Sequence, residues 1–201
     1  MKKINLHPVT PEKRFLKDIA RFLENSGIMI YPTDSGYSLG CSALSKKAIR
    51  RLYQIKRPSK KYNMALMFQN FSPISEFARL HNNAFKFMKS LVPGAYTFIL
   101  PATNRGRKLL EVKRPEMGIR FPDHPFLSAL HQLFPDPILT TSARVHDNDI
   151  FSVPDEIEKV FSAKVDLVVD CGPIPQRPTT VISLIDTDPV LIRGGAGVLP
   201  F

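Results

Sequence analysis

The sequence has few cysteines and no long apolar run, and both shortages exclude whole classes of protein. Only Cys41 and Cys171 occur among 201 residues, and they form neither a CxxC pair nor a disulfide framework. No apolar stretch approaches the roughly 20 residues that a membrane-spanning helix needs. No apolar segment follows the N-terminal lysines either, so a secretory signal is not indicated. We expect a reducing, cytoplasmic location, with both cysteines as small buried residues at strand ends.

Motifs of several large enzyme classes are also missing. The chain has no GxxxxGK(S/T) loop, no GxGxxG after a strand, no GxSxG and no HExxH. Its 5 histidines lack the spacing of metal ligands. We therefore expect neither a dedicated metal site nor a tightly bound cofactor.

Positive charge is abundant and unevenly spread. The chain carries 28 Lys and Arg against 18 Asp and Glu, a net charge of +10 with a pI near 9.8. Residues 1–120 hold 23 cationic and 7 acidic side chains, whereas residues 121–201 hold 5 and 11. This asymmetry indicates a basic face for polyanions such as nucleic acid or nucleotide phosphates. A general contribution to solubility is the alternative.

Hydrophobic patterning predicts a single domain over residues 1–201. The first helix is expected to begin with Thr10 as N-cap and Pro11 as its first residue, and to close at Gly27. A buried strand at 28–31 then ends at Pro32. A second helix is predicted at 45–56, with others at 72–80, 83–91, 125–134 and 154–162, and strands at 64–68, 96–100, 118–122, 137–142, 166–170, 179–185 and 189–193.

The order of these elements predicts the fold class. Strands and helices interleave along most of the chain, but the last strands follow one another with no helix between them. The expected fold is therefore α/β (α+β in stricter schemes), a twisted mixed sheet flanked by helices rather than a purely parallel doubly wound sheet.

Residues 30–40, IYPTDSGYSLG, are predicted to leave the strand and form a polar loop. Gly36 lets the backbone approach another group closely. Thr33, Asp34 and Ser35 are placed to line a small-ligand pocket. A turn closed by local side-chain hydrogen bonds is the alternative.

Residues 46–61 form a basic stretch that contains no acid. Its like-charge pairs at i,i+4, such as Lys46 with Arg50, cost helix stability, and no local acid offsets that cost. Phosphate binding is therefore favoured over a merely solvated face. The residues predicted to bind RNA, as tRNA or double-stranded RNA, are Lys46, Lys47, Arg50, Arg51, Lys60 and Lys61.

Two arginines lie in otherwise apolar strands, Arg120 in GIRFP and Arg193 in VLIRGG. Burying such a charge is costly unless an anion pairs with it. We expect the partner to be either a carboxylate from residues 121–201 or the carboxylate or phosphate of a ligand.

The ordered set of motifs resembles the YrdC-like family, whose best-known members make threonylcarbamoyl-AMP. YPTDSGYSLGC, IKRP, PGAYTFIL and MGIRFPDHPF occur in the family's order, followed by TTSA, PTTV and LIRGGAG. The resemblance covers about residues 10–195, and the length and the first block look most like the YciO-type branch. It implies a YrdC-like fold with a basic concave cavity.

The resemblance also implies a reaction. L-Threonine and bicarbonate form a carbamate, which attacks the α-phosphorus of ATP and releases pyrophosphate, with Mg²⁺ accompanying ATP. The product serves the modification of an adenosine in tRNA. The implied partners are ATP, L-threonine, bicarbonate and RNA, without a membrane.

Positions that match the family's motifs receive roles from the resemblance. Lys56 and Arg57 stand in the basic motif that meets the triphosphate and are the catalytic candidates. The threonine-binding candidates are Ser35, Arg120, Thr140 and Thr179. The nucleotide-binding candidates are Lys56, Arg57, Ser142 and Arg193.

The chain departs from the family at two of these motifs. Lys56-Arg57-Pro58 is one residue shorter than the family's Lys-x-Arg-Pro, and Arg144 stands where the family has the asparagine of Ser-Ala-Asn. In helical geometry a shift of one residue turns a side chain by about 100°. We therefore expect a weakened synthase; the alternative is an RNA-binding protein without efficient synthase activity.

Overall fold

Short apolar segments pair side by side in the computed structural model, which describes residues 1–56, 64–110, 115–144 and 151–199. The strands are β1 (Lys2–Asn5), β2 (Met29–Thr33), β3 (Gly36–Ser42), β4 (Ala65–Met67), β5 (Tyr96–Pro101), β6 (Glu116–Arg120), β7 (Ile138–Ser142), β8 (Leu167–Asp170), β9 (Thr180–Ser183) and β10 (Val190–Arg193). They form a 10-stranded sheet in the order β1-β8-β2-β3-β7-β4-β6-β5-β9-β10. The β2–β8 pair is parallel and the β2–β3 pair antiparallel, which confirms the predicted mixed sheet.

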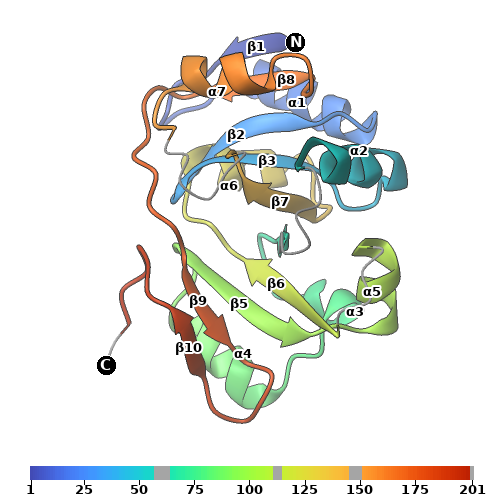
Figure 1. The fold of residues 1–201 in the computed structure, drawn as a ribbon, viewed down its shortest axis with the longest axis vertical. Helices are drawn as coiled ribbons and strands as arrows, with labels where there is room; N and C mark the ends of the chain where they lie inside the picture. The colour runs from blue at the N-terminus through green and yellow to red at the C-terminus, as the bar shows by residue number, and fades with distance from the viewer. Residues whose placement is uncertain (57–63, 111–114, 145–150, 200–201) are drawn as a thin grey trace.

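Helices pack on both faces of this sheet. They are α1 (Lys13–Glu24), α2 (Lys46–Lys56), α3 (Ile74–Phe77), α4 (Asn82–Lys89), α5 (Asn104–Leu110), α6 (Pro125–His131) and α7 (Pro154–Phe161). Buried side chains of α1 and α6 share one apolar cluster, and those of α2, α3, α4 and α7 share a second. Figure 1 shows β1, β8, β2, β3 and β7 in the upper half of the molecule and β6, β5, β9 and β10 in the lower half.

The first helix begins later than predicted. α1 begins at Lys13 with Glu12 as its N-cap, so Thr10 and Pro11 precede it. The Thr10 hydroxyl lies 3.0 Å from His7 Nδ1, and the Thr10 N–H donates to the same nitrogen at 3.1 Å. The cap prediction was wrong because Thr10 makes a local turn with a residue upstream rather than capping the helix.

The end of the same helix also differs in detail. Ser26, rather than Gly27, adopts the left-handed backbone conformation, with φ of 66°. The Gly27 N–H donates to Phe22 O at 3.1 Å and closes the last turn. A Cβ at Gly27 would lie 2.2 Å from the Phe22 ring, so a larger residue there requires that ring to move.

Pro32 does not end the strand in which it lies. β2 continues to Thr33, and Pro32 sits opposite Tyr37 of β3. On its other side β2 pairs with β8 only at Met29 and Ile30. The missing N–H of Pro32 therefore leaves no β8 carbonyl without a donor, which is why the strand continues past it.

The segment predicted as a polar loop is mostly a strand. Only Asp34 and Ser35 separate β2 from β3, and all 7 residues of β3 are buried. β3 lies inside the sheet between β2 and β7, so its serines are enclosed by neighbouring strands. Among them, Ser38 reaches a polar cavity.

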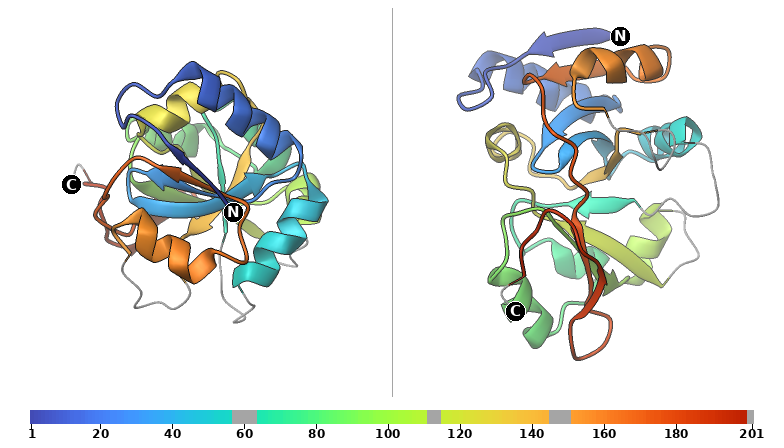
Figure 2. Two further views of the ribbon diagram at one scale, coloured as in Figure 1. Left: turned by 90° about the horizontal axis from the view of Figure 1, so that it is seen from above. Right: turned by 60° about the vertical axis from the view of Figure 1, so that its left-hand side comes forward.

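Residues 171–179 carry the chain from β8 to β9 without regular structure. This linking segment runs down one side of the molecule from the upper to the lower half (Figures 1 and 2). Its Arg177 N–H donates to Ser35 O at 3.2 Å, and its Gln176 packs against Gly36. The linking segment therefore closes one side of the space beside the β2–β3 turn.

Candidate active site

A cavity of about 340 Å³ lies where the ends of several central strands meet the linking segment. Six residues predicted from the sequence line it together, namely Ser35, Arg120, Thr140, Ser142, Thr179 and Arg193. They come from the β2–β3 turn, from β6, β7 and β10, and, for Thr179, from the end of the linking segment. The threonine candidates and two of the nucleotide candidates thus share one space, as the sequence motifs implied.

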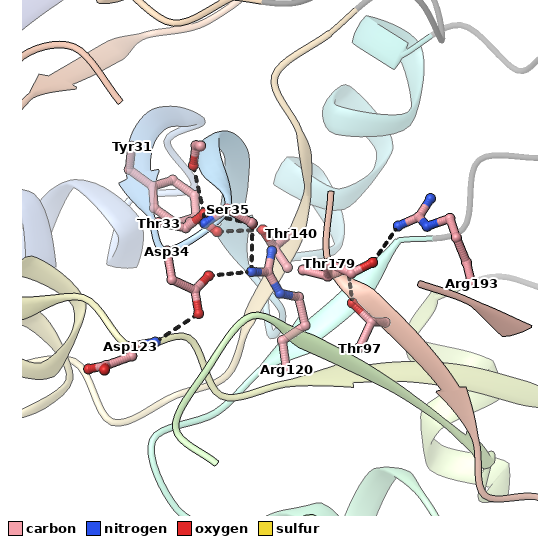
Figure 3. Close-up of polar contacts among 11 residues, drawn as sticks. Tyr31, Thr33, Asp34, Ser35, Thr97, Arg120, Asp123, Thr140, Thr179 and Arg193 are labelled. Carbon is pink, nitrogen blue, oxygen red and sulfur yellow. Dashed lines mark hydrogen bonds and ion pairs between the residues drawn. The ribbon is translucent and has the colours of Figure 1, made fainter. Parts of the chain in front are cut away.

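Arg120 is the charged group at one end of this cavity, and its side chain is 8% exposed. Its Nη2 donates to Asp34 Oδ1 at 2.7 Å and to Ser35 Oγ at 2.9 Å (Figure 3). The other oxygen of Asp34 accepts from the Asp123 N–H at 3.0 Å. The first of the two expected partners, a carboxylate from residues 121–201, was wrong, because the β2–β3 turn brings Asp34 to Arg120. The second, a ligand anion, stays a prediction.

Burying this ion pair costs electrostatic free energy. Burial raises the pKa of Asp34, and the positive charge of Arg120 opposes that rise. Arg120 Nε is buried and has no hydrogen-bond partner among the described residues. An unpartnered buried donor is costly, so an incoming anion that accepts from Nε removes that cost.

Hydroxyl groups form much of the remaining wall. Tyr31 donates its phenolic hydrogen to Thr140 Oγ1, and Thr97 Oγ1 lies 2.8 Å from Thr179 Oγ1 (Figure 3). Burial raises the pKa of Tyr31, which keeps its phenol protonated and donating. Thr140 therefore accepts from Tyr31 and retains its own hydrogen for a ligand.

Gly195 lets the chain after β10 approach the linking segment closely. A Cβ at Gly195 would lie 2.3 Å from Pro178 O, and the Gly195 N–H donates to Thr180 Oγ1 at 3.0 Å. This close approach lets Arg193 Nη2 donate to Thr179 O at 3.0 Å. Tight packing at the edge of the cavity thus explains the glycine at 195, whereas a Cβ at Gly194 would meet nothing within 4 Å.

Several lining residues were not predicted from the sequence. Tyr37, Ser38, Thr97, Gln176 and Pro178 all face the cavity. The run of prolines in residues 173–178 was the available signal for the linking segment, because closely spaced prolines favour an extended chain. The other unpredicted residues lie on strands, and no local pattern identifies them because those strands come together only in the tertiary structure.

Comparison with known proteins identifies the family of this chain. The model of the Sua5/YciO/YrdC family, described as telomere recombination, matches residues 21–195. The chain belongs to this family. The uncharacterized protein YciO of Escherichia coli K12 is 38% identical over 199 residues, which are 98% of this chain and 97% of YciO. The crystal structure of E. coli YciO has a TM-score of 0.91 at 36% identity and covers 100% of this chain and 98% of its own.

More distant Sua5/YciO/YrdC relatives carry functional names. The threonylcarbamoyl-AMP synthase of Hydrogenovibrio crunogenus is 29% identical over 152 residues, 74% of this chain and 82% of its own. The crystal structure of P. abyssi Sua5 complexed with L-threonine has a TM-score of 0.87 at 24% identity, over 97% of this chain and 58% of its own. At that identity the likeness shows the fold alone.

Lys56, the first residue of the basic motif, lies beside the cavity. Lys56 is 4% exposed, and its Nζ donates to the carbonyls of Ser142 and Arg144. It is not among the described residues that line the cavity. Arg57, Lys60 and Lys61 lie outside the described residues.

The cations of α2 divide into two groups. Lys46, Lys47 and Arg50 are exposed. Arg51 instead donates to both carboxylate oxygens of Asp166, at 3.0 and 2.8 Å. The acid that the local sequence lacks is therefore supplied to Arg51 by Asp166, the residue before β8.

Within the part of the chain that the structure describes, no group of three or more His, Cys, Asp or Glu side chains is placed to hold a metal ion. Asp34, the carboxylate nearest Arg120, is already engaged by that arginine. The same described residues contain no helix long and apolar enough to cross a membrane.

Proposed function

We propose that the cavity binds L-threonine and ATP and makes threonylcarbamoyl-AMP from L-threonine, bicarbonate and ATP. The observation that carries this proposal is that the buried Nε of Arg120 has no hydrogen-bond partner among the described residues. The Arg120 side chain lines a cavity whose wall is rich in hydroxyl groups. An α-amino acid supplies the carboxylate that such a donor lacks. The named activity of the H. crunogenus relative and the threonine complex of P. abyssi Sua5 support the choice of substrate.

In this proposal the protein acts by positioning and by neutralising charge. Arg120 and Ser35 bind the carboxylate of threonine, and the hydroxyls of Thr140 and Thr179 orient the rest of the amino acid. The threonine nitrogen attacks the carbon of bicarbonate, and water leaves to give the carbamate. A carbamate oxygen then attacks the α-phosphorus of ATP, and pyrophosphate leaves.

The nucleotide occupies the opposite end of the cavity in this proposal. Ser142 and Arg193, which also line the cavity, contact the nucleotide there. Mg²⁺ arrives with ATP, because the phosphate oxygens of the nucleotide supply ligands that the described side chains do not. The resulting adenylate would serve the modification of an adenosine in tRNA.

We expect the reaction to be slower than in relatives with the unaltered motifs. Arg144 adds a cation where the family has a neutral asparagine, and the Lys56-Arg57 motif is one residue short. A positioning group displaced by about 1 Å can cost on the order of a hundredfold in rate.

The test is pyrophosphate release by the purified protein with L-threonine, bicarbonate, Mg²⁺ and ATP. Release should require threonine and should be lost in Arg120→Gln, while calorimetry shows weakened threonine binding by that variant. Arg105→Gln is the matched control, because Arg105 pairs with Glu76 on the exposed surface, outside the cavity. The proposal fails if the unmodified protein neither binds threonine nor releases pyrophosphate in response to it.

A second candidate function is RNA binding by the outer face of α2. The observation in its favour is that Lys46, Lys47 and Arg50 are exposed on one short helix that contains no acid. Exposed cations of this kind bind phosphate backbones in a salt-dependent manner. This function needs no turnover in the cavity and is tested separately.

A further inference from the structure

One side chain among the described residues that line the cavity is an amide, that of Gln176. It belongs to the linking segment, which runs down one side of the molecule (Figure 2). The other polar side chains of the described lining are hydroxyls or guanidinium groups. A guanidinium only donates hydrogen bonds and carries a charge, whereas an amide is neutral and has both donors and an acceptor. Gln176 therefore gives this wall an uncharged donor with two hydrogens.

A backbone group sets the orientation of this amide. Gln176 Oε1 accepts from the Phe151 N–H at 3.1 Å. A backbone N–H can only donate, so the oxygen of the amide, and not its nitrogen, faces Phe151. No described residue accepts a hydrogen bond from Gln176 Nε2. Both hydrogens of this nitrogen therefore remain for a ligand in the cavity.

The backbone is anchored on either side of Gln176. The Ile174 N–H donates to Ser152 O at 2.8 Å, and the Arg177 N–H donates to Ser35 O at 3.2 Å. These bonds hold the linking segment against two separate parts of the chain. The side chain between them is thus in place before a ligand arrives, which lowers the entropy cost of binding.

Gln176 also lies beside the part of the cavity that is proposed to hold threonine. A Cβ at Gly36 would lie 3.1 Å from Gln176 Cα, so only a glycine lets the two segments approach this closely. The residue before Gly36 is Ser35, whose hydroxyl accepts from Arg120 Nη2 at 2.9 Å. Ser35 and Arg120 bind the carboxylate of threonine in the proposed function. The nitrogen of the amino acid is one carbon away from that carboxylate and so lies near the same wall.

The chemistry of the carbamate matches this amide. When the threonine nitrogen is carboxylated, it gains two oxygens that accept hydrogen bonds, which the free amine lacks. Ser35, Arg120, Thr140 and Thr179 already bind other atoms of the amino acid in the proposed function. The nitrogen of an amide is not nucleophilic, unlike that of an amine. It therefore donates to these oxygens without competing with threonine for the carbon of bicarbonate.

We propose that Gln176 recognises the carbamate on the threonine nitrogen, with Nε2 donating to the carbamate oxygens. The identity of this ligand rests on the proposed function, which forms a carbamate. The cavity then binds N-carboxylated threonine more tightly than free threonine. Binding shifts an equilibrium toward the form that is bound more tightly, so Gln176 favours carboxylation of threonine in the cavity.

The experiment compares two ligands by calorimetry, without ATP. N-Carbamoyl-L-threonine is a stable probe that carries the carbonyl oxygen, and L-threonine in bicarbonate-free buffer lacks it. Gln176→Met should lower the preference for the carbamoyl ligand about fivefold, as expected for one lost hydrogen bond. L-Threonine affinity should change less than twofold. N-Methyl-L-threonine, which has a substituent without oxygen, should be as insensitive as L-threonine.

A second variant separates the lost donor from lost anchoring. Gln176→Glu keeps an oxygen that accepts from the Phe151 N–H but has no amide hydrogens. It should lower the preference for the carbamoyl ligand at least as much as Gln176→Met does. The matched controls are Gln69→Met and Gln69→Glu, because Gln69 is exposed and is not among the described residues that line the cavity. Thermal unfolding confirms that each variant is folded.

The assignment is overturned if the unmodified protein does not bind N-carbamoyl-L-threonine, or if Gln176→Met loses affinity equally for both ligands or for neither. Failure of the proposed function gives a different result. Gln176-dependent preference for the carbamoyl ligand, without threonine-dependent release of pyrophosphate, would remove the reaction but keep the recognition site. Turnover with a preference that does not depend on Gln176 would remove the recognition site alone.

Discussion

Asp34 and Arg120 meet in a buried ion pair, Oδ1 to Nη2 at 2.7 Å, although 86 residues separate them in the chain. The pair joins the β2–β3 turn to the end of β6 and fixes the guanidinium beside Ser35 (Figure 3). Removing one member of a buried pair leaves the other charge without compensation. The pair therefore couples the stability of the fold to the shape of the cavity.

Asp34→Ala should destabilise the protein strongly, by about 3–5 kcal/mol, because Arg120 then remains buried without its counter-charge. Replacing both charges, in Asp34→Leu with Arg120→Met, should recover most of that free energy of unfolding, measured by urea titration. Both variants should lose threonine binding. A double variant as unstable as Asp34→Ala would contradict this account.

The free energy of unfolding should fall as the pH is lowered from about 6.5 to about 4. Burial lowers the pKa of His124 to about 4. The folded protein therefore binds a proton on this side chain at a lower pH than the unfolded chain does. The contribution of His124 over this window is about 2–3 kcal/mol. Burial also lowers the pKa of His131, which acts in the same direction.

His124→Asn isolates this effect. His124 Nδ1 accepts from the Phe126 N–H at the start of α6, and asparagine is also a good N-cap. The variant should therefore fold and show a flatter dependence of stability on pH between 6.5 and 4. An unchanged pH dependence would exclude His124 as the titrating group.

Gly36→Ala should destabilise the protein more than Gly172→Ala does. Both glycines have positive φ, 111° and 88°, so both substitutions carry backbone strain on the order of 1–3 kcal/mol. At Gly36 the new Cβ would also lie 3.1 Å from Gln176 Cα, whereas nothing lies within 4 Å at Gly172. Chemical denaturation measures the difference, and threonine affinity should fall only in Gly36→Ala. Equal losses of stability in the two variants would show that the linking segment moves freely away from the β2–β3 turn.

Charge reversal on α2 should weaken RNA binding without affecting ATP binding. The variant replaces Lys46, Lys47 and Arg50 by Glu and leaves Arg51 intact, because Arg51 is paired with Asp166. The slope of log affinity against log salt should become shallower by up to about three units. The matched control reverses three exposed cations elsewhere, Arg79, Lys86 and Lys89. Equal losses in both variants would indicate attraction by net charge alone.

The sequence by itself determined the architecture and much of the site. Apolar periodicity predicted the mixed sheet and most of its elements, because burial of alternate or i,i+4 side chains is a local property of the chain. Six residues that the motifs singled out line one cavity, while their roles stay predictions. Local patterns failed where a neighbour distant in sequence decided the outcome, as at Pro32, whose strand continues because β8 pairs only with the start of β2.

Only the tertiary structure decided the charge partners. The sequence around Arg120 predicted an anionic partner without identifying it, and folding brings Asp34 to Arg120. The helix that contains no acid predicted unpaired cations, but folding brings Asp166 to Arg51. The physical reason is that ion pairs depend on distances of a few ångströms between side chains, whereas the sequence fixes only which charges exist. Strand order and the path of the linking segment set those distances.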